Sequence, residues 1–497
     1  MRGSKGKVIS KDSNAGFELL RKLSYNEMYQ LAMYTLNQYR GTAVSCRYAI
    51  PPTLSNQDSQ SALKNRFEAA IIKTILQNPV LQVGIVDADS KAPTWTRLDR
   101  LDLGNHIEWR SIESSVGIER LLQQTVASQI DTTFPQLDRQ PGWRIVILRQ
   151  GTIDDLEVIF TWNHPHADGT SGKIFHEALL RSLNDMGEDN PPLDGNTLIL
   201  PKSAPRLPVP IEKLSTLPMD AKYVMTTLWE LLKPSLFSKS LTQASWAPIQ
   251  ASPYKTQVRF FTVDREALDS ILAKCRQHQT TLTGLLHALA ALAFASHLRD
   301  TFSFQSGTPI DARRFLQAGP GFQPDRTMAN YVTMMDHEFA GTVVESLRSA
   351  LSEAKTLERV WSIAADVRRQ IEKKLANGLK NDEICLGRFV KDWRAQMREK
   401  ASKPRQLSWL VTNLGVLEGS PTPESVGEKS KSEAWSIRQS QLTLSAEVPG
   451  AAIVISAMTA TNGPLCVTTN WQECLFDPSF GDQIMGHVEQ WLRRIGS

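Results

Sequence analysis

Residues 156–180 constrain the fold most, because they join an apolar strand to a helix through a turn that contains proline and glycine. Residues 156–162 are mostly apolar or β-branched, which is typical of a strand. Residues 174–180 have the pattern of a helix. In the turn, Pro165 fixes one backbone angle, and Gly169 permits conformations that other residues resist. This strand-to-helix unit predicts an α/β layer fold.

The turn places His164 four residues before Asp168 and closes with Gly169. Such a turn can hold an imidazole rigidly, and Asp168 precedes a helix whose first turn favours a carboxylate. A metal site with His164, His166 and Asp168 as ligands is the alternative. Alternate residues of an extended segment point in opposite directions, however, and no acidic or Cys partner lies nearby. We therefore expect no metal, and we expect His166 to pack or to support the site.

The segment from His164 to Gly169 resembles the His-x-x-x-Asp-Gly signature of the CoA-dependent acyltransferase superfamily. That superfamily includes chloramphenicol acetyltransferase, the BAHD plant enzymes, peptide-synthetase condensation domains and the fungal alcohol acetyltransferases. Its fuller signature begins His-His, whereas this chain has Asn163 at the first position. The second His is the general base in the family, and the Asp holds the loop in shape. The resemblance thus assigns the base to His164 and the structural support to Asp168 and Gly169.

A second segment, Asp311-Ala312-Arg313 with Asn330 downstream, resembles the Asp-x-Arg element of the same superfamily. There the Arg crosses from the second half of the molecule to pair with the Asp of the His motif. The resemblance implies that Arg313 pairs with Asp168 and that Asp311 supports the site. A guanidinium suits this role, because it binds a carboxylate through parallel hydrogen bonds and keeps its charge when buried. The alternative is a solvated Asp-Arg-Arg turn.

Residues 407–419, 452–458 and 465–471 look like the "Asn-Leu-Gly" strand and the two strands after it in fungal alcohol acetyltransferases. The Asp-Phe-Gly-Trp-Gly motif of the BAHD enzymes is absent, so the resemblance favours the fungal group. A helix over residues 483–492 is expected to close the chain. Polar residues in this region are the candidates to stabilise an oxyanion: Thr412, Asn413, Gln439, Ser440 and Gln441.

Helix and strand patterns alternate along both halves of the chain. The predicted helices are 67–76, 118–130, 265–276 and 281–297, and the predicted strands are 81–86, 143–148 and 257–263. A proline-rich span, residues 191–210, interrupts both patterns and marks the crossing between the halves. The apolar pattern of residues 223–232 predicts a helix, which we expect to pack across this linker rather than to lie on a membrane surface.

The resemblance implies two chloramphenicol-acetyltransferase-like subdomains, each a mixed sheet with flanking helices. We expect them at residues 16–200 and 256–497, joined by a crossover linker at residues 201–255, with a tunnel between them and His164 near its middle. Two substrates could then enter from opposite ends. Holding them in line makes the reaction effectively unimolecular, which can contribute ~7–11 kcal/mol.

Composition excludes several classes of protein. The 497 residues carry 56 Lys and Arg against 52 Asp and Glu, a balance of +4 that is too even for a nucleic-acid-binding protein. The five Cys are widely spaced, without a Cys-x-x-Cys pair, which fits reduced thiols. No apolar run follows the charged N-terminus, whose first four residues resemble an expression-tag leader, and residues 420–432 read as an exposed loop. We expect a cytoplasmic monomer without a transmembrane segment.

The resemblance implies transfer of an acetyl group from acetyl-CoA, as co-substrate, to a hydroxyl of a small-molecule alcohol. We expect no permanently bound cofactor, since the chain lacks a nucleophile elbow, a phosphate loop and a dinucleotide fingerprint. A secondary metabolite such as a trichothecene-like alcohol is the expected acceptor. Two alternatives stay open. One is a condensation-type or cyclising catalyst of a biosynthetic pathway, and the other is a non-catalytic binding module on the same fold.

Overall fold

A computed structural model describes residues 16–55, 59–112, 117–150, 154–185, 192–232, 242–420 and 434–497. The strands are β1 Leu19–Lys22, β2 Thr42–Ala49, β3 Val83–Val86, β4 Thr94–Arg97, β5 Arg100–Asp102, β6 Ile107–Ile112, β7 Trp143–Gln150, β8 Asp155–Trp162, β9 Leu193–Asp194, β10 Thr197–Ile199, β11 Thr256–Val263, β12 Phe304–Asp311, β13 Val332–Phe339, β14 Trp409–Leu417, β15 Ser436–Leu444, β16 Ile453–Ala460 and β17 Leu465–Gln472.

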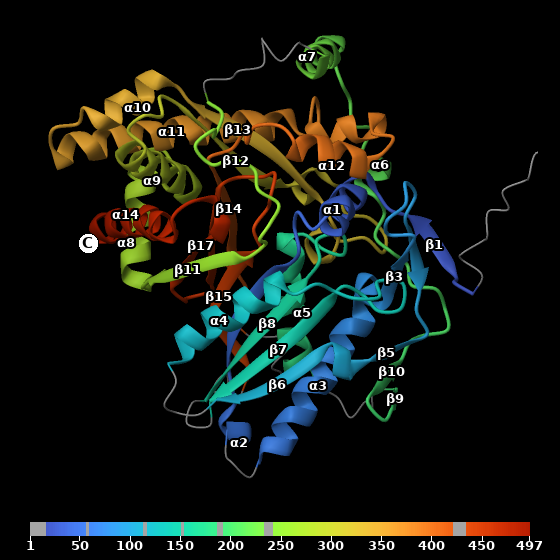
Figure 1. The fold of residues 1–497 in the computed structure, drawn as a ribbon. Coiled ribbons are helices and arrows are strands. Elements are labelled where there is room, and N and C mark those ends of the chain that lie inside the picture. Colours follow the sequence, from blue (N-terminus) through green and yellow to red (C-terminus); the bar gives the residue numbers. More distant parts are fainter. Residues whose placement is uncertain are drawn as a thin grey trace, which may run out of the picture.

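The helices pack around the strands (Figure 1). They are α1 Tyr25–Thr35, α2 Pro52–Ser55, α3 Gln60–Gln77, α4 Ile118–Asp131, α5 Gly169–Asn184, α6 Ile211–Leu214, α7 Ala221–Leu232, α8 Arg265–Gln277, α9 Leu282–His297, α10 Gly341–Arg348, α11 Glu353–Asn377, α12 Trp393–Ala401 and α14 Pro478–Gly496. Short 3-10 turns include η5 Ala312–Phe315, η6 Pro324–Arg326 and η7 Glu383–Phe389.

The chain folds into two α/β halves, each built around one large mixed sheet. The N-terminal half holds a five-stranded sheet in the order β15-β2-β8-β7-β6. The C-terminal half holds a six-stranded sheet in the order β11-β17-β16-β14-β12-β13. Smaller sheets, β1-β4-β3 and β5-β10-β9, flank the N-terminal half. The expected α/β class with two halves is therefore confirmed.

Strand β15 connects the two halves. Although its residues follow β14 in sequence, β15 pairs antiparallel with β2 and completes the edge of the N-terminal sheet. Residues 256–497 therefore do not all contribute to one sheet, and Gln439, Ser440 and Gln441 belong to the sheet of the N-terminal half.

Apolar side chains fill the space between each sheet and its helices. In the N-terminal half, Phe175 of α5 stacks on Phe160 of β8, and Phe67 of α3 packs edge-on against Tyr48 of β2, within one buried cluster. In the C-terminal half, α9 is buried on nearly every face, because its small and apolar residues lie between the sheet, α11 and α14. These cores hold the motif-bearing turn and the facing strands rigidly.

Helix α7 is the part that departs from its expected packing. It projects from the body of the molecule (Figure 1), and Met225 and Trp229 are 71% and 64% exposed. The expectation that its apolar residues pack across the linker is wrong for these two side chains, since an apolar pattern predicts a helix but does not supply its partner. No helix of the described ranges is long and apolar enough to cross a membrane. The N-terminal leader and residues 421–432 of the expected loop lie outside those ranges.

Candidate active site

The turn between β8 and α5 carries the His motif. Trp162 ends β8, and its indole nitrogen donates to the carbonyl of Ala167, 2.7 Å away, which closes the turn. At the start of α5, a Cβ atom on Gly172 would lie 2.4 Å from the Trp162 ring and 2.7 Å from Val44. Only glycine lets the helix approach the strand so closely, and this approach fixes the start of α5 beside the turn.

Asp168 caps α5, and both of its carboxylate oxygens are fully engaged. One oxygen accepts from the backbone N–H of Ser171 and lies 2.8 Å from the Ser171 hydroxyl. The other accepts from Arg313, at 2.7 Å, and from the N–H of Tyr331, at 2.8 Å. Burial alone would raise the pKa of Asp168, but Arg313 and these hydrogen bonds outweigh it and hold the pKa below its ordinary value. Asp168 is thus a permanently charged support and not a proton acceptor.

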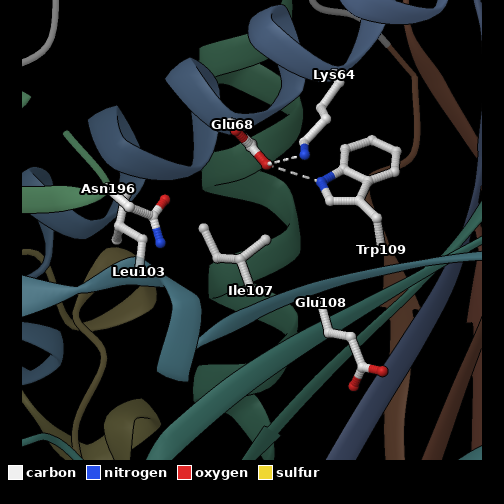
Figure 2. A pocket seen from close by; sticks show the side chains of 7 residues that line it. All are labelled: Lys64, Glu68, Leu103, Ile107, Glu108, Trp109 and Asn196. Carbon is white, nitrogen blue, oxygen red and sulfur yellow. Dashed lines mark hydrogen bonds and ion pairs between the residues drawn. The ribbon is translucent and has the colours of Figure 1, made fainter.

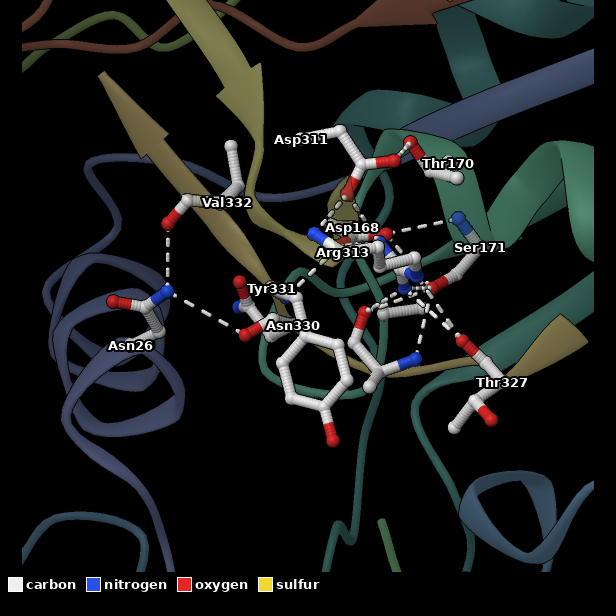
Figure 3. A network of polar contacts seen from close by, with 12 residues as sticks. Asn26, Asp168, Thr170, Ser171, Asp311, Arg313, Thr327, Asn330, Tyr331 and Val332 are labelled. Carbon is white, nitrogen blue, oxygen red and sulfur yellow. Dashed lines mark hydrogen bonds and ion pairs between the residues drawn. The ribbon is translucent and has the colours of Figure 1, made fainter. Parts of the chain in front are cut away.

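Arg313 joins the two halves at this point (Figure 3). Its side chain is 2% exposed and donates to Asp168, to Asp311 and to the carbonyl of Thr327. It also donates to the carbonyl of Ala329, at 3.0 Å. Asp311 in turn accepts from the backbone N–H of Arg313 and from the hydroxyl of Thr170. The alternative of a solvated Asp-Arg-Arg turn is therefore wrong.

His164 lies half-buried at the seam between the halves. The side-chain amide of Asn330 donates to the backbone carbonyl of His164, at 2.9 Å, and lies 3.4 Å from its Nδ1 atom. Asn330 is itself placed by Asn26, whose amide donates to the carbonyl of Val332 at 2.7 Å (Figure 3). The ring of Tyr39 lies 5.7 Å from the imidazole, centroid to centroid.

The electrostatics keep His164 neutral at physiological pH. Burial lowers its pKa to about 4, against smaller raising effects from the charge of Asp168 and from a hydrogen bond with its own backbone. Because Nδ1 faces Asn330 and the backbone, Nε2 is the free ring nitrogen, and it has no hydrogen-bond partner within the described residues. A neutral imidazole with a free Nε2 can accept a proton.

His166 and Asn163 form a separate buried pair. Nδ1 of His166 lies 2.5 Å from the side-chain oxygen of Asn163, and its ring contacts Trp95 edge-on at 4.8 Å. A Cβ atom on Gly142 would overlap the Asn163 side chain, so these residues pack tightly. Asn163 stands where the His-x-x-x-Asp-Gly signature in its fuller form has its first His. Its side chain contacts His166 and lies against Gly142, just before β7, and it has no contact with the His164 ring among the described residues.

The C-terminal candidates do not gather at one place. Leu414 lies against Gly169, and the backbone N–H of Glu418 donates to Glu177, so β14 runs alongside α5. Thr412, two residues before Leu414 on the same face of β14, therefore lies toward the turn that carries His164. Asn413 faces the other way, since its amide donates to Thr283 of α9 and accepts from the N–H of Gly415.

Gln439, Ser440 and Gln441 lie away from the His motif. Ser440 pairs with Cys46 of β2, and Cys46 is opposite Val158, four residues before the end of β8. At ~3.3 Å per residue this places Ser440 ~13 Å along the sheet from Trp162. This register is at odds with the interpretation of these three residues as oxyanion donors. The sequence alone did not reveal the pairing of β15 with β2 that sets the register.

Two polar residues that the sequence analysis did not single out continue from Thr412 across the C-terminal sheet. Thr412 is opposite Ser456 of β16, and Ser456 is opposite Thr468 of β17. The hydroxyls of Ser456 and Thr468 are buried and have no hydrogen-bond partner within the described part of the chain. We call these three side chains the hydroxyl row. Only Ser456 lies between two apolar residues in the sequence, so alternation did not reveal the row.

A surface pocket of about 310 Å³ lies elsewhere, between α3 and β6 (Figure 2). Its lining residues are Lys64, Glu68, Leu103, Ile107, Glu108, Trp109 and Asn196. Glu68 accepts from the Trp109 indole at 2.9 Å, so its polar groups are partly satisfied by one another. The pocket shares no residue with the His164 network. In the described ranges, no three His, Cys, Asp or Glu side chains are grouped so that they could hold a metal ion.

Sequence comparison relates the chain to fungal proteins along its whole length. A family model described as alcohol acetyltransferase matches residues 115–448. A probable alcohol acetyltransferase of Fusarium pseudograminearum, FCK4, is 23% identical over 496 residues and covers 96% of each chain. A probable alcohol acetyltransferase of Aspergillus fumigatus, crmB, is 22% identical over 492 residues, covering 95% of this chain and 99% of that protein.

Two solved structures have the same fold. The trichothecene 15-O-acetyltransferase TRI3 of Fusarium sporotrichioides matches with a TM-score of 0.67 at 15% identity, over 98% of this chain and 96% of that one. The first condensation domain of the CDA synthetase matches with a TM-score of 0.61 at 12% identity, over 96% of both chains.

Proposed function

This chain belongs to the alcohol acetyltransferase family, and we propose from that premise that it transfers an acetyl group from acetyl-CoA to a hydroxyl of a secondary metabolite. It is an acyltransferase, and its family implies an acyl-CoA co-substrate and an alcohol acceptor. The single observation that carries the proposal is the neutral His164 with a free Nε2, held between Asn330 and the Asp168–Arg313 pair.

In this proposal, Nε2 of His164 takes the proton of the acceptor hydroxyl while the hydroxyl oxygen attacks the thioester carbonyl carbon. A new C–O bond forms, and the carbonyl electrons move onto the oxygen of a tetrahedral intermediate. When the intermediate collapses, the C–S bond breaks and the CoA thiolate receives the proton from His164. General-base assistance of this kind contributes ~100- to 10,000-fold. No covalent enzyme intermediate is needed.

Thr412 is our candidate for the donor to the oxyanion. It lies on β14, beyond the start of α5 and toward the turn of His164, and its hydroxyl belongs to the hydroxyl row. The unpartnered hydroxyls of Ser456 and Thr468 favour an acceptor that carries further oxygen atoms, since buried polar groups are normally hydrogen-bonded. This supports an oxygenated secondary metabolite, and the name of TRI3 as a trichothecene acetyltransferase points in the same direction.

We further propose that the chain works as two subdomains, residues 16–200 and 256–497, joined by the linker at residues 201–255. Acetyl-CoA and the alcohol would enter a tunnel between them from opposite ends. The contacts of Arg313 and Asn330 with the turn of His164 support this arrangement, because a base placed by residues of both halves lies at their seam.

The direct test is release of free CoA thiol when the protein is incubated with acetyl-CoA and a panel of hydroxylated metabolites. We expect release that depends on both substrates and an acetyl ester of the acceptor by mass spectrometry. If no CoA is released with any alcohol, but the thiol of a carrier protein is freed when an amine and the carrier-protein thioester are added, the condensation-type alternative is favoured. Absence of release with all of them would favour a binding module.

A further inference from the structure

One side of α5 lies along the seam between the halves and carries cations. Lys173, Glu177 and Arg181 follow one another at four-residue intervals, so they share one face of the helix. At the start of this face, Thr170 donates to Asp311 of the C-terminal half. Further along, Glu177 accepts from the backbone N–H of Glu418. Lys173 and Arg181, both half-exposed, therefore lie beside the C-terminal half.

A third cation approaches from that half. The segment after η6 lies against the first turn of α5, because Ala329 contacts the Ser171 hydroxyl through both its N–H and its carbonyl. Arg326, at the end of η6, is exposed and lies close enough to Arg181 for their charges to repel. Burial, and then this repulsion, lowers the pKa of Arg181, while Glu177 raises it.

The guanidinium groups of Arg181 and Arg326 form no direct ion pair among the described residues, although Glu177, four residues before Arg181, attracts Arg181. Lys173 lies 3.9 Å from Glu177. By contrast, Arg313, the other arginine that meets the first turn of α5, is neutralised by its pair with Asp168. Glu177, which also pairs with Lys173, is a single negative charge beside three cations. The cluster therefore keeps a net positive charge, which a bound anion would stabilise.

We propose that Arg181, Arg326 and Lys173 bind the phosphate groups of the CoA co-substrate, which rests on the proposed function. Guanidinium groups bind phosphate through paired hydrogen bonds, and ammonium groups bind it as point charges. From Gly169 to Arg181 the helix rises ~18 Å. The extended pantetheine arm would follow α5 and β14 along this length and bring the thioester to the turn of His164, while the phosphates stay at the far end of the cation face.

Kinetics with two thioesters test the proposal. S-acetyl-N-acetylcysteamine presents the same reacting thioester as acetyl-CoA but has no phosphate. Arg181→Gln and Arg326→Gln should raise KM for acetyl-CoA at least about tenfold each, because a hydrogen bond to a charged group is lost. Their kcat, and their kcat/KM for S-acetyl-N-acetylcysteamine, should stay at the wild-type value. The control is Arg368→Gln. This half-exposed arginine of α11 pairs with Glu372, and its replacement should change neither parameter.

Equal losses with both thioesters would overturn the proposal, because they would mean a general disturbance of α5. Acetyl-dephospho-CoA, which lacks the 3′-phosphate, tests the individual phosphates. If the cations bind the 3′-phosphate, wild-type protein should bind acetyl-dephospho-CoA more weakly than acetyl-CoA. The variants should show a smaller difference between the two ligands. 4′-phosphopantetheine, the single-phosphate arm of a carrier protein, distinguishes the second source of the same chemistry. If it competes as well as CoA in wild-type protein, the cations recognise a carrier arm and the assignment to CoA is wrong.

Calorimetric titration of CoA, without an acceptor, separates this inference from the proposed function. Weaker CoA binding by both arginine variants supports the phosphate site even if no alcohol is ever acetylated. Unchanged CoA binding by both variants overturns it, whatever the activity.

Discussion

Asn330 holds the backbone of His164 more closely than its ring: the amide nitrogen lies 2.9 Å from the carbonyl oxygen and 3.4 Å from Nδ1. A residue of the C-terminal half therefore fixes the backbone of a residue in the N-terminal half. Arg313, also in the C-terminal half, holds Asp168 of the N-terminal half in the same way, four residues after His164. The position of the imidazole thus depends on both halves, which agrees with a reaction space at their seam.

Replacing His164 by Ala should leave the fold intact and lower acyl transfer by at least ~100-fold, which is the lower bound for losing a positioned base. The measurement is the initial rate of CoA thiol release, with circular dichroism as the check on folding. His278→Ala, an exposed histidine on the C-terminal half, is the matched control and should keep full activity. Near wild-type turnover of His164→Ala would contradict the proposed mechanism.

The pH dependence of the rate should reflect the low pKa of His164. The neutral imidazole is the active form, so kcat/KM should stay flat from pH 8 to below 6 and fall only as the pH approaches about 4. Asn330→Asp places a carboxylate near Nδ1, which favours the charged imidazolium and should move the acidic limb to higher pH. A wild-type limb near the ordinary histidine pKa of ~6.5 would mean that His164 is more solvated than this structure implies.

Asp168→Asn and Arg313→Ala should each destabilise the protein by ~3–5 kcal/mol, because each leaves a buried partner without its counter-charge. The double variant should lose clearly less than the sum, since the same pair is broken once. Chemical denaturation measures the free energy of unfolding. Combining Asp168→Asn with the distant Arg368→Ala is the control and should give additive losses. Additivity in the first pair would show that the two residues are not coupled.

Initial rates should show that both substrates bind before reaction. Plots against one substrate at several levels of the other should give intersecting lines, because among the described residues no Ser, Thr or Cys side chain is hydrogen-bonded to Nε2 of His164 and placed to carry the acetyl group. Cys46, Cys275 and Cys385 are buried, and burial raises the pKa of each thiol, so each stays protonated and unreactive at neutral pH. Parallel lines, or an acetylated protein mass after acetyl-CoA alone, would point to a covalent intermediate instead.

Gly172→Ala should destabilise the protein by ~1–3 kcal/mol, because its methyl group would overlap the ring of Trp162 and the side chain of Val44. Transfer should also fall, since α5 would move away from the turn of His164. Gly319→Ala, where a Cβ atom meets nothing within 4 Å, is the control and should change the free energy of unfolding by less than ~0.5 kcal/mol. A stable and fully active Gly172→Ala variant would mean that α5 accommodates the methyl group.

Local signals predicted the motif-bearing turn and most element types. The strand predicted over residues 257–263 is Thr256–Val263, and the helix predicted over residues 118–130 is Ile118–Asp131. These succeeded because hydrophobic periodicity is a property of neighbouring residues. The contact of Arg313 with Asp168 spans 145 residues, and it was expected only because the two segments resemble a known family.

Pairings between distant segments were not predictable from periodicity. Nothing in residues 436–444 indicates that they pair with β2. Ser440 was therefore kept as a candidate donor to the oxyanion, although the pairing places it well along the sheet from the end of β8. The direction of Asn413 depended in the same way on the position of Thr283 in α9. The exposure of Trp229 was missed for the converse reason, since an apolar residue indicates burial only if another element covers it.

Strand β15 is made late but completes the N-terminal sheet, and this order matters during synthesis on the ribosome. Until residues 436–444 have left the exit tunnel, one edge of β2 lacks its hydrogen-bonding partner, although all the other strands of that sheet were made much earlier. An unpaired edge invites pairing with other chains. The nascent N-terminal half should therefore depend on chaperones until the C-terminal half emerges, and a chain truncated before residue 436 should aggregate rather than persist as a separate domain.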